Sequence, residues 1–253
     1  MRTLTRVRVV VAVLAVLVAG WPAVGQADDR IVGGRDATEP YGFVASLHAF
    51  EFPGAFCSGS LLDPRWVLTA RHCVKDATAP DLQVSLEPDP FRPHLVQVKA
   101  IHGPPPTGAD LALLELSAPA AGTPIGIAGA GRWPGPVRIL GFGDVCQGRD
   151  CDAHWLQELD TSIVSPVACR DRDIDPRLEF CVQRHDRDGG ACQGDSGGPA
   201  ARPLPGGRWV LLGALSRGNP KSCRTGPDVY TDAWAHRDWI ARFVPPVAEP
   251  TAG

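Results

Sequence analysis

Long apolar runs are scarce in this sequence of 253 residues, and the longest lies near the N-terminus, from Val9 to Val18. Arginines precede it and small residues follow it. A glycine and a proline end the apolar region before it reaches the ~20 residues that a membrane-spanning helix requires. The pattern is typical of a secretory signal peptide rather than a membrane anchor. We therefore expect a signal peptide at residues 1–27, cleaved after Gly25 or Ala27, and a secreted protein that is not held at the membrane.

An excess of basic residues is also absent. The chain has 25 Lys and Arg and 28 Asp and Glu; residues 1–30 hold four Arg and two Asp, so 21 basic and 26 acidic residues remain, a net charge of −5. Nucleic-acid-binding proteins usually present a basic face, so we expect no nucleic-acid partner. Hydrophobic residues make up 44% of the chain and charged residues 21%, which excludes general disorder.

Paired C-x-x-C spacings, typical of zinc sites, do not occur among the eight cysteines. We therefore expect no metal site and no other cofactor. All eight cysteines follow the expected signal peptide, and an even set in an exported protein most simply forms four disulfides. Spacing alone does not assign the pairs, because eight cysteines allow 105 pairings. The cysteines are Cys57, Cys73, Cys146, Cys151, Cys169, Cys181, Cys192 and Cys223.

Long helical patterns are missing as well, while turn residues are plentiful, with 25 prolines and 28 glycines. Short apolar runs alternate with these turn residues, which predicts an all-β protein of many strands. Examples of the runs are Gly42–Leu47, Trp66–Ala70, Val96–Ile101, Leu111–Leu116, Val137–Phe142 and Trp209–Leu215. An ordered region of about 215 residues suits two packed barrels or a pair of sandwiches.

The C-terminal region departs from this strand pattern. Ala235, Trp239, Ile240 and Phe243 fall on one face at helical spacing, so we expect a terminal amphipathic α-helix. Residues 245–253 have little to bury and are expected to form a disordered tail.

A hydroxyl stands between a carboxylate and two glycines in the sequence GDSGGP at residues 194–199. Such a cluster is typical of a tight turn, and it also has the residue types of a nucleophile beside an oxyanion hole. His72 follows an apolar strand, and Asp110 opens the apolar run DLALLEL. A partly buried carboxylate needs a donor, which an imidazole can supply. The chain order His72, Asp110, Ser196 is a known order for a hydrolytic triad.

Five segments together resemble those of trypsin-like (chymotrypsin-fold) serine proteases, in the same order along the chain. They are IVGG at residues 31–34 after Arg30, TARHC at 69–73, DLALL at 110–114, GDSGGP at 194–199 and PDVYT at 227–231. The resemblance covers residues 31 to about 244 and implies a peptidase domain of two packed six-stranded antiparallel β-barrels with a C-terminal helix. The high Ala, Pro, Gly and Arg content points to a bacterial source with GC-rich coding.

The resemblance implies a catalytic role for each member of the triad. Ser196 would attack the scissile carbonyl, His72 would take and return its proton, and Asp110 would orient the imidazole. The backbone N–H groups of Gly194 and Ser196 would receive the oxyanion. Ser216 matches the family's serine that supports the triad aspartate.

Asp195 places a negative charge beside an oxyanion hole, so its charge must have another use. In the family, cleavage before Ile-Val-Gly-Gly frees an amine that is buried against this aspartate. The resemblance therefore implies a zymogen with a propeptide at residues 28–30, cleaved at Arg30-Ile31. The alternative is a signal peptide cleaved directly before Gln26 or Asp28 without further processing, which would leave a poorly ordered zymogen.

The resemblance also assigns most of the cysteines. It implies Cys57–Cys73 beside His72, Cys169–Cys181 in the second half and Cys192–Cys223 across the specificity pocket. Cys146 and Cys151 remain for a local fourth pair that has no match in the family. No calcium-binding loop of the kind found in some relatives is recognisable between His72 and Asp110.

The pocket departs from that of trypsin. Gly190 stands where trypsin has the aspartate of the pocket floor, and Asp228 stands where trypsin has a glycine on the wall. A carboxylate on the wall predicts cleavage after Arg or Lys, with weaker selectivity. If Asp228 pairs with Arg217 or Arg224, a chymotrypsin-like or mixed preference is expected instead.

The strand edge expected to bind the substrate also differs from the family pattern, at one position. The neighbours of Ser216 should form the edge onto which the substrate backbone adds as a strand. Arg217, followed by Gly218, replaces a tryptophan that is common in the family, so one wall of the cleft is altered.

The resemblance implies a secreted serine endopeptidase that is a monomer. The partners it implies are protein or peptide substrates and protein protease inhibitors. The competing hypothesis is a catalytically silent binding protein of the same fold. Such proteins usually have a replaced triad residue, whereas His72, Asp110 and Ser196 are all present. An α/β-hydrolase esterase would need helices alternating with strands, which this sequence does not predict.

Overall fold

The computed structural model describes residues 31–50, 54–129, 134–146, 151–186, 188–219 and 222–245. The expected signal peptide, the propeptide and residues 246–253 of the expected tail lie outside these ranges. No helix in the described part of the chain combines the length and the hydropathy needed to cross a membrane.

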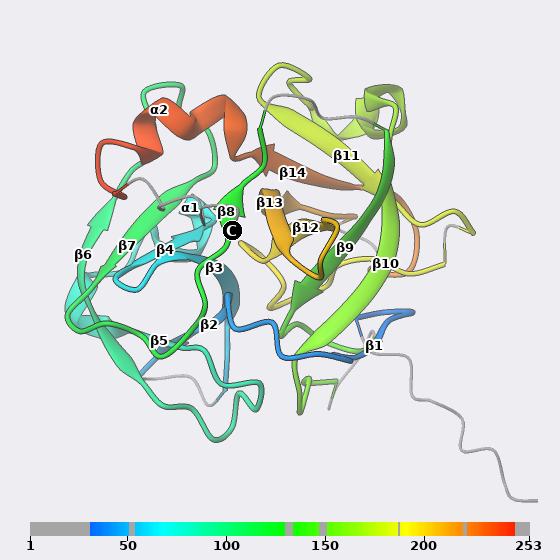
Figure 1. The fold of residues 1–253 in the computed structure, drawn as a ribbon. Coiled ribbons are helices and arrows are strands. Elements are labelled where there is room, and N and C mark those ends of the chain that lie inside the picture. The colour runs from blue at the N-terminus through cyan, green and yellow to red at the C-terminus, as the bar shows by residue number, and fades with distance from the viewer. Residues whose placement is uncertain are drawn as a thin grey trace, which may run out of the picture.

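The first half of the chain forms a closed antiparallel barrel of six strands in the order β2-β3-β4-β7-β6-β5 (Figure 1). The barrel encloses a core of aliphatic side chains, including the fully buried Leu47, Leu61, Leu68 and Leu113. Its strands are Val44–Ala49 (β2), Cys57–Asp63 (β3), Trp66–Thr69 (β4), Leu82–Ser85 (β5), Val96–His102 (β6) and Ala112–Leu116 (β7).

The second half forms another six-stranded antiparallel ring, in the order β9-β10-β11-β14-β13-β12, which closes through the pairing of β12 with β9. Arg35–Asp36 (β1) pairs with β10, and Gly126–Ile127 (β8) runs parallel to β13. The ring strands are Gly135–Gly141 (β9), Gln157–Val164 (β10), Glu179–Gln183 (β11), Pro199–Pro203 (β12), Trp209–Arg217 (β13) and Asp228–Asp232 (β14). The prediction of two packed six-stranded barrels is confirmed.

Helices are few and short in the described chain. They are Arg71–Val74 (α1), Ala79–Asp81 (η1, a 3-10 helix), Pro166–Arg172 (η2), Trp234–His236 (η3) and Arg237–Ile240 (α2). The terminal helix is present but shorter than its apolar pattern predicts, because a 3-10 turn precedes it and turns follow it. The α2 helix lies beside the first barrel (Figure 1). Its apolar face packs on that barrel: the Phe243 ring lies 5.9 Å from that of Trp66, and Trp239 and Ile240 belong to the same core.

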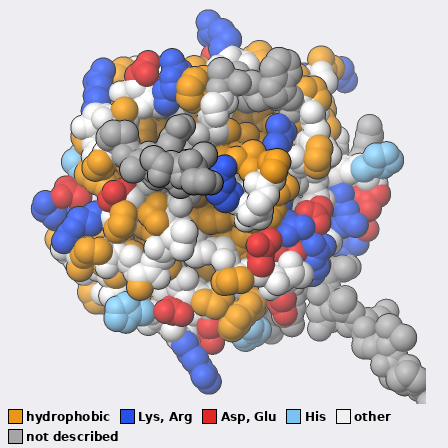
Figure 2. Space-filling model, in the orientation of Figure 1, with side chains coloured by type: hydrophobic (Ala, Val, Ile, Leu, Met, Phe, Trp, Pro, Cys, Tyr) orange, Lys and Arg blue, Asp and Glu red, His pale blue; other side chains and the backbone are white. Residues whose placement is uncertain are grey.

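The surface has no single dominant charge on the face drawn in Figure 2, where acidic and basic side chains are interspersed. One charged cluster extends inward from the surface of the second barrel. The Glu158 side chain is completely buried, and its carboxylate pairs with Arg35 at 2.6 Å and Arg138 at 3.3 Å. Tyr41 and Thr38 donate to it from the segment that precedes the first barrel. Burial alone would raise the pKa of Glu158, but the hydrogen bonds from Tyr41 and Thr38 outweigh it and lower the pKa.

Replacing Glu158 by Gln should destabilise the protein by about 3 kcal/mol, because the change leaves Arg35 and Arg138 without their buried counter-ion. The comparison is by urea unfolding in a Ser196→Ala background, which prevents self-digestion. The loss should shrink at acidic pH, since the carboxylate with a lowered pKa stabilises only while it is ionised. Asp160→Asn is the control: this partner of Arg138 is 57% exposed, and its loss should cost under about 1 kcal/mol. Equal losses for the two variants would contradict the assignment of Glu158 as the buried centre of the cluster.

Candidate active site

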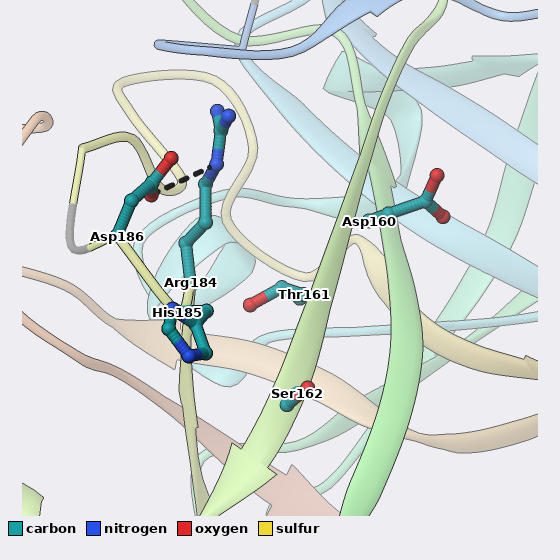
Figure 3. A pocket seen from close by; sticks show the side chains of 6 residues that line it. All are labelled: Asp160, Thr161, Ser162, Arg184, His185 and Asp186. Carbon is teal, nitrogen blue, oxygen red and sulfur yellow. Dashed lines mark ion pairs between the residues drawn. The ribbon is translucent and has the colours of Figure 1, made fainter.

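Two open hollows lie on the second barrel, and neither contains the expected catalytic residues. A cavity of about 290 Å³ is lined by Asp160–Ser162 of β10 and by Arg184–Asp186, which follow β11 (Figure 3). The Arg184 guanidinium is already engaged there, by Asp186 at 3.0 Å and by the backbone oxygen of Gly33 at 2.6 Å. The other, of about 550 Å³, lies between η2 and the segment before β14.

Strand pairing brings His72 and Asp110 together although they are far apart in the sequence. Thr69 at the end of β4 pairs with Ala112 at the start of β7. His72 therefore follows one strand at the same edge of the barrel where Asp110 precedes the other. Asp110 Oδ2 lies 2.8 Å from His72 Nδ1, and Asp110 Oδ1 accepts from the backbone N–H of His72 at 2.8 Å.

Ser216 of β13 supplies the third donor to Asp110, from its Oγ to Oδ2 at 2.8 Å. Burial alone would raise the pKa of Asp110, but the bonds and charge of His72 and the bond from Ser216 hold it below its ordinary value. The carboxylate therefore stays ionised and holds the imidazole by its Nδ1. An imidazole held in this way leaves Nε2 free to exchange a proton with a nucleophile.

Ser196 lies in the loop before β12, where contacts from both barrels hold its backbone. Its carbonyl accepts from the N–H of Ser58 in the first barrel at 2.8 Å, and the next residue, Gly197, donates to Leu215 O of β13 at 2.9 Å. Within the described chain, Ser196 Oγ has no hydrogen bond to His72 Nε2 or to any other atom. Catalytic hydrogen bonds of unliganded enzymes are often long and tighten when substrate binds.

Gly194 has a backbone conformation that glycine adopts readily, with φ of +92°. Its carbonyl accepts from Ser58 Oγ at 2.9 Å. Within the described residues, no acceptor is bonded to the N–H groups of Gly194 and Ser196. Two unengaged backbone donors beside a serine hydroxyl can bind an oxyanion. Ser58, which holds this loop, was not predicted from the sequence, because no motif marks it.

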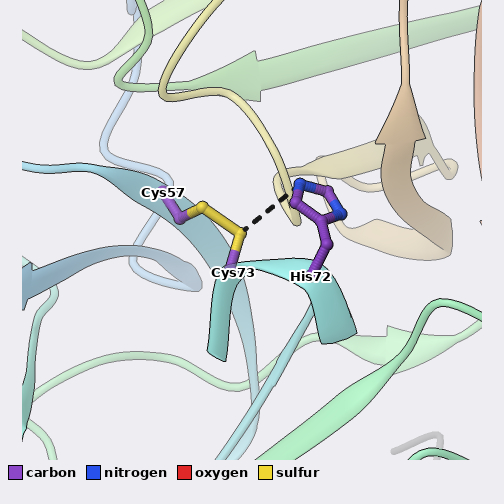
Figure 4. A group of neighbouring side chains, drawn as sticks. All are labelled: Cys57, His72 and Cys73. Carbon is purple, nitrogen blue, oxygen red and sulfur yellow. Dashed lines mark hydrogen bonds between the residues drawn. A yellow bond between two sulfur atoms is a disulfide. The ribbon is translucent and has the colours of Figure 1, made fainter. Parts of the chain in front are cut away.

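The disulfide between Cys57 and Cys73 lies directly beside the His72 ring, with Cys73 Sγ 3.9 Å from Nε2 (Figure 4). Cys57, His72 and Cys73 are close enough together to suggest metal ligands. Metal binding by cysteine requires a thiolate, and both sulfurs here are consumed in the disulfide. The cluster therefore fits a covalent support for the α1 turn better than a metal site.

The structure contains all four of the expected disulfides. Cys192–Cys223 joins the two segments that flank Asp228, and Cys169–Cys181 ties η2 to β11. Cys146–Cys151 closes a short loop, part of which lies outside the described residues.

Asp195 is buried and accepts two backbone hydrogen bonds at 2.8 Å, from Gly143 and Cys192. Burial raises its pKa to about 7, against the lowering effect of these two bonds. Within the described residues it has no ion-pair partner. An added cation would therefore bind it strongly in its ionised form.

The segment that begins at Ile31 is inserted into the second barrel. Ile31 and Val32 are both 1% exposed, and Val32 O accepts from the N–H of Gly190 at 3.0 Å. Gly189 permits this approach, because a Cβ at that position would overlap Val32 O. Ile31 has φ of +35°, a region that β-branched residues rarely adopt and that costs roughly 1–3 kcal/mol.

Asp228 lies buried between Gly190 and Gly218. A Cβ on Gly190 would stand 2.9 Å from its Oδ2, and a Cβ on Gly218 would stand 2.8 Å from its Oδ1. Within the described residues, its Oδ2 accepts from the N–H of Ala191 at 3.0 Å. Burial raises the pKa of Asp228 to about 7.

The alternative in which Asp228 pairs with Arg217 or Arg224 does not occur in the structure. Arg217 pairs with Glu179 at 2.6 Å, and Arg224 pairs with Asp188 at 2.8 Å. The carboxylate of Asp228 thus keeps its capacity for a cationic ligand.

The expected substrate edge, Ser216–Gly218, is partly occupied by side chains that the sequence did not reveal. Arg172 Nη1 donates to Gly218 O at 3.2 Å. Arg217 is turned toward η2 and Glu179, and it also reaches Ser216 Oγ at 3.2 Å. Neither Arg172 nor Glu179 belongs to a recognisable motif, so only the folded arrangement identifies them.

Comparison with known proteins gives one family. The family model described as Trypsin matches residues 31–240. A trypsin-like protease of Streptomyces glaucescens is 28% identical over 229 residues, which cover 85% of this chain and 83% of that protein. Coagulation factor XII of Sus scrofa is 31% identical over 252 residues, covering 84% of this chain and 39% of that protein. Factor XII of Cavia porcellus is 32% identical over 258 residues, covering 84% of this chain and 40% of that protein. The chain thus spans about two fifths of the factor XII proteins.

Proposed function

Because the chain belongs to the trypsin family of serine proteases, we propose that it is a secreted serine endopeptidase that acts through His72, Asp110 and Ser196. The observation that chiefly supports the proposal is the 2.8 Å hydrogen bond between His72 Nδ1 and a partly buried Asp110 carboxylate. The two unengaged backbone N–H groups beside Ser196 support it further. Its substrates are proteins or peptides, its regulators include protein protease inhibitors, and it acts as a monomer outside the cell.

The proposed reaction begins when Ser196 Oγ attacks the carbonyl carbon of the scissile peptide bond and His72 Nε2 takes the hydroxyl proton. The carbonyl oxygen becomes an oxyanion that the N–H groups of Gly194 and Ser196 bind. His72 then gives its proton to the leaving amine, and an acyl-enzyme remains on Ser196 Oγ. Water attacks this ester by the same proton transfers, which releases the acid and restores the serine. Asp110 stabilises the imidazolium in both halves of the reaction.

Activation is proposed to occur by cleavage of Arg30-Ile31. The new amine would be the cation that the buried Asp195 carboxylate lacks. Cleavage also removes the carbonyl carbon that defines φ of Ile31, so the strain of its +35° conformation ends with the peptide bond. The ion pair would then hold the loop of Gly194 so that the N–H groups of Gly194 and Ser196 remain available to an oxyanion.

The substrate side chain before the scissile bond is proposed to be Arg or Lys. The supporting observation is the Asp228 carboxylate, which lies beside Gly190 and Gly218 without an ion-pair partner among the described residues. Selectivity should be weaker than that of a carboxylate on the pocket floor, because the cation meets this one from the side.

Ser196→Ala and His72→Ala should fold but lose on the order of 10⁴ or more of the peptidase rate. A fluorophosphonate probe should label the cleaved wild type at Ser196 and fail to label the Ser196→Ala variant. His154→Ala is the matched control, since that imidazole packs on Phe91 at 5.2 Å and should leave the rate unchanged. If a triad variant keeps a tenth of the wild-type rate, the assignment of the triad is wrong. If the probe does not label the wild type, the hypothesis of a catalytically silent binding protein is favoured.

The chain that begins at Ile31 should be active, and the chain that still carries Asp28-Asp29-Arg30 should have little activity. A free α-amine has an ordinary pKa of ~8, and its pairing with Asp195 should raise that value. Activity should therefore hold at neutral pH and decline as the pH rises through the raised pKa of the amine. Mass spectrometry identifies the N-terminus, and Arg30→Ala is the uncleavable control. Full activity in the intact chain would refute this account.

Asp228→Gly should lower the preference for Arg and Lys over Phe and Leu peptides by about ten- to a hundredfold, the usual worth of a hydrogen bond to a charge. Because burial raises the pKa of Asp228 to about 7, the wild-type preference should also weaken between pH 8 and pH 5.5. The ratio of rates for two substrates cancels any pH dependence that the two reactions share. A wild-type preference for Phe or Leu, or an unchanged ratio in Asp228→Gly, would show that Asp228 does not select the substrate.

A further inference from the structure

Arg217 is the residue of β13 that follows Ser216, and its guanidinium is fully engaged within the protein. Its Nε donates to Arg172 O at 2.8 Å, and Nη2 donates to Asp173 O at 2.9 Å. Glu179 binds it bidentately, with Oε1 2.6 Å from Nη1 and Oε2 2.9 Å from Nη2. The remaining Nη1 donor reaches Ser216 Oγ at 3.2 Å. A guanidinium has five N–H groups in one plane, so these contacts fix both its position and its orientation.

The contact with Ser216 connects this cation to the triad carboxylate. Ser216 has a single hydroxyl proton, which it donates to Asp110 Oδ2 at 2.8 Å, so its oxygen accepts from Arg217. A hydroxyl that accepts from a cation is polarised and becomes a stronger donor. Arg217 is therefore two hydrogen bonds away from Asp110, which in turn binds His72.

We infer that Arg217 is a positioning residue that acts through Ser216 on Asp110, and that Glu179 sets how strongly its charge acts on the triad. This inference rests on the proposed function of the site. A positive charge near Asp110 stabilises the carboxylate and opposes a second positive charge on His72. The carboxylate of Glu179 offsets the charge of Arg217 and so weakens that opposition.

The charged groups around Arg217 come from each element packed against it. Glu179 lies on β11, Asp110 precedes β7 and Asp173 follows η2. All three favour the charged form of Arg217, Glu179 most strongly, and its pKa is raised. Arg172, at the end of η2, offers Arg217 only its backbone oxygen, while its guanidinium turns to Gly218 O. Of these groups, Glu179 therefore acts most strongly on the charge of Arg217.

A purely structural role would be to anchor the end of η2 through the carbonyls of Arg172 and Asp173. The two roles differ in what they predict for single variants. Loss of an anchor should weaken the fold or lower the rate at every pH. A charge effect should move the pH dependence of the nucleophile, in opposite directions for Arg217→Met and Glu179→Gln.

The test measures how fast diisopropyl fluorophosphate inactivates the chain that begins at Ile31, as a function of pH. Ser196 Oγ forms a bond to phosphorus, fluoride leaves, and His72 takes the hydroxyl proton, so the reaction requires a neutral imidazole and slows at acidic pH. This small uncharged reagent does not need the peptide-binding edge on which Arg217 lies. The acidic midpoint therefore reports the charge around His72 rather than substrate binding.

Arg217→Met should move this acidic midpoint up by on the order of half a pH unit, and Glu179→Gln should move it down by a similar amount. At a pH well below the midpoint, the Arg217→Met rate should be about threefold lower than the wild-type rate. The double variant should return close to the wild-type midpoint. Arg170→Met is the matched control, because this exposed η2 arginine approaches Asp171 at 3.7 Å, and its loss should leave the midpoint in place.

Midpoints that stay at the wild-type value in both variants, or that move in the same direction, would overturn the inference while the proposed function stands. A wild type that is never inactivated would instead contradict the proposed function. If Arg217→Met does not fold, as judged by circular dichroism, the direction of the Glu179→Gln shift decides the matter. A downward shift supports the inference, and no shift or an upward shift overturns it.

Discussion

Hydrogen-bond donors to buried carboxylates are the constraint on which the site depends. Asp110 receives three donors, from the backbone and ring of His72 and from Ser216, and its pKa is lowered in spite of burial. Asp195 receives two backbone donors and Asp228 receives one, and burial raises the pKa of each to about 7. One residue type thus has two different protonation behaviours within one site, set by surroundings alone. The lowered pKa of Asp110 suits a counter-ion that is always charged. The raised pKa values of Asp195 and Asp228 suit carboxylates that become fully ionised when a cation binds.

The contact between the barrels positions the donors as well as the carboxylates. Ser58 of the first barrel is fully buried and binds three parts of the second: it donates to Ser196 O and Gly194 O and accepts from Phe142 N. Thr69, at the end of β4 and three residues before His72, donates to Ser58 O at 2.7 Å. The loop of Ser196 and the turn of His72 are therefore held by one shared residue. Displacement of one barrel against the other would move the serine away from the histidine.

Periodicity and turn residues predict the strands well, because the buried residues of a barrel strand are neighbours in the sequence and appear there as a short apolar run. Each of the six apolar runs forms a strand; Leu111–Leu116, for example, contains β7. The terminal helix is shorter than predicted, since packing of Phe243 on Trp66 and on Trp239 accommodates turns as well as a regular helix. His72, Asp110, Ser196 and Ser216 are identified by motif, and the folded chain places both His72 and Ser216 within hydrogen-bonding distance of Asp110.

The partners of the charged side chains could not be predicted in the same way. Arg217 and Arg224 were equally plausible partners of Asp228, yet each has a closer carboxylate, Glu179 or Asp188. Glu179 is 38 positions from Arg217, and it is brought near by the pairing of both β11 and β13 with β14. Such contacts depend on strand order and side-chain reach, which leave no periodic signal in the sequence.

Asp195 and Asp228 also act on each other, since the charge of Asp195 is among the causes that raise the pKa of Asp228, after burial and the opposing bond from Ala191. In the uncleaved chain, ionisation of one carboxylate therefore opposes ionisation of the other. A cation beside Asp195 would neutralise that charge and weaken the opposition. The amine released at Ile31 would then do more than order the oxyanion loop: it would favour the ionised form of Asp228, on which the proposed preference for basic side chains depends. Activation and selectivity would be coupled through two carboxylates buried in the same barrel.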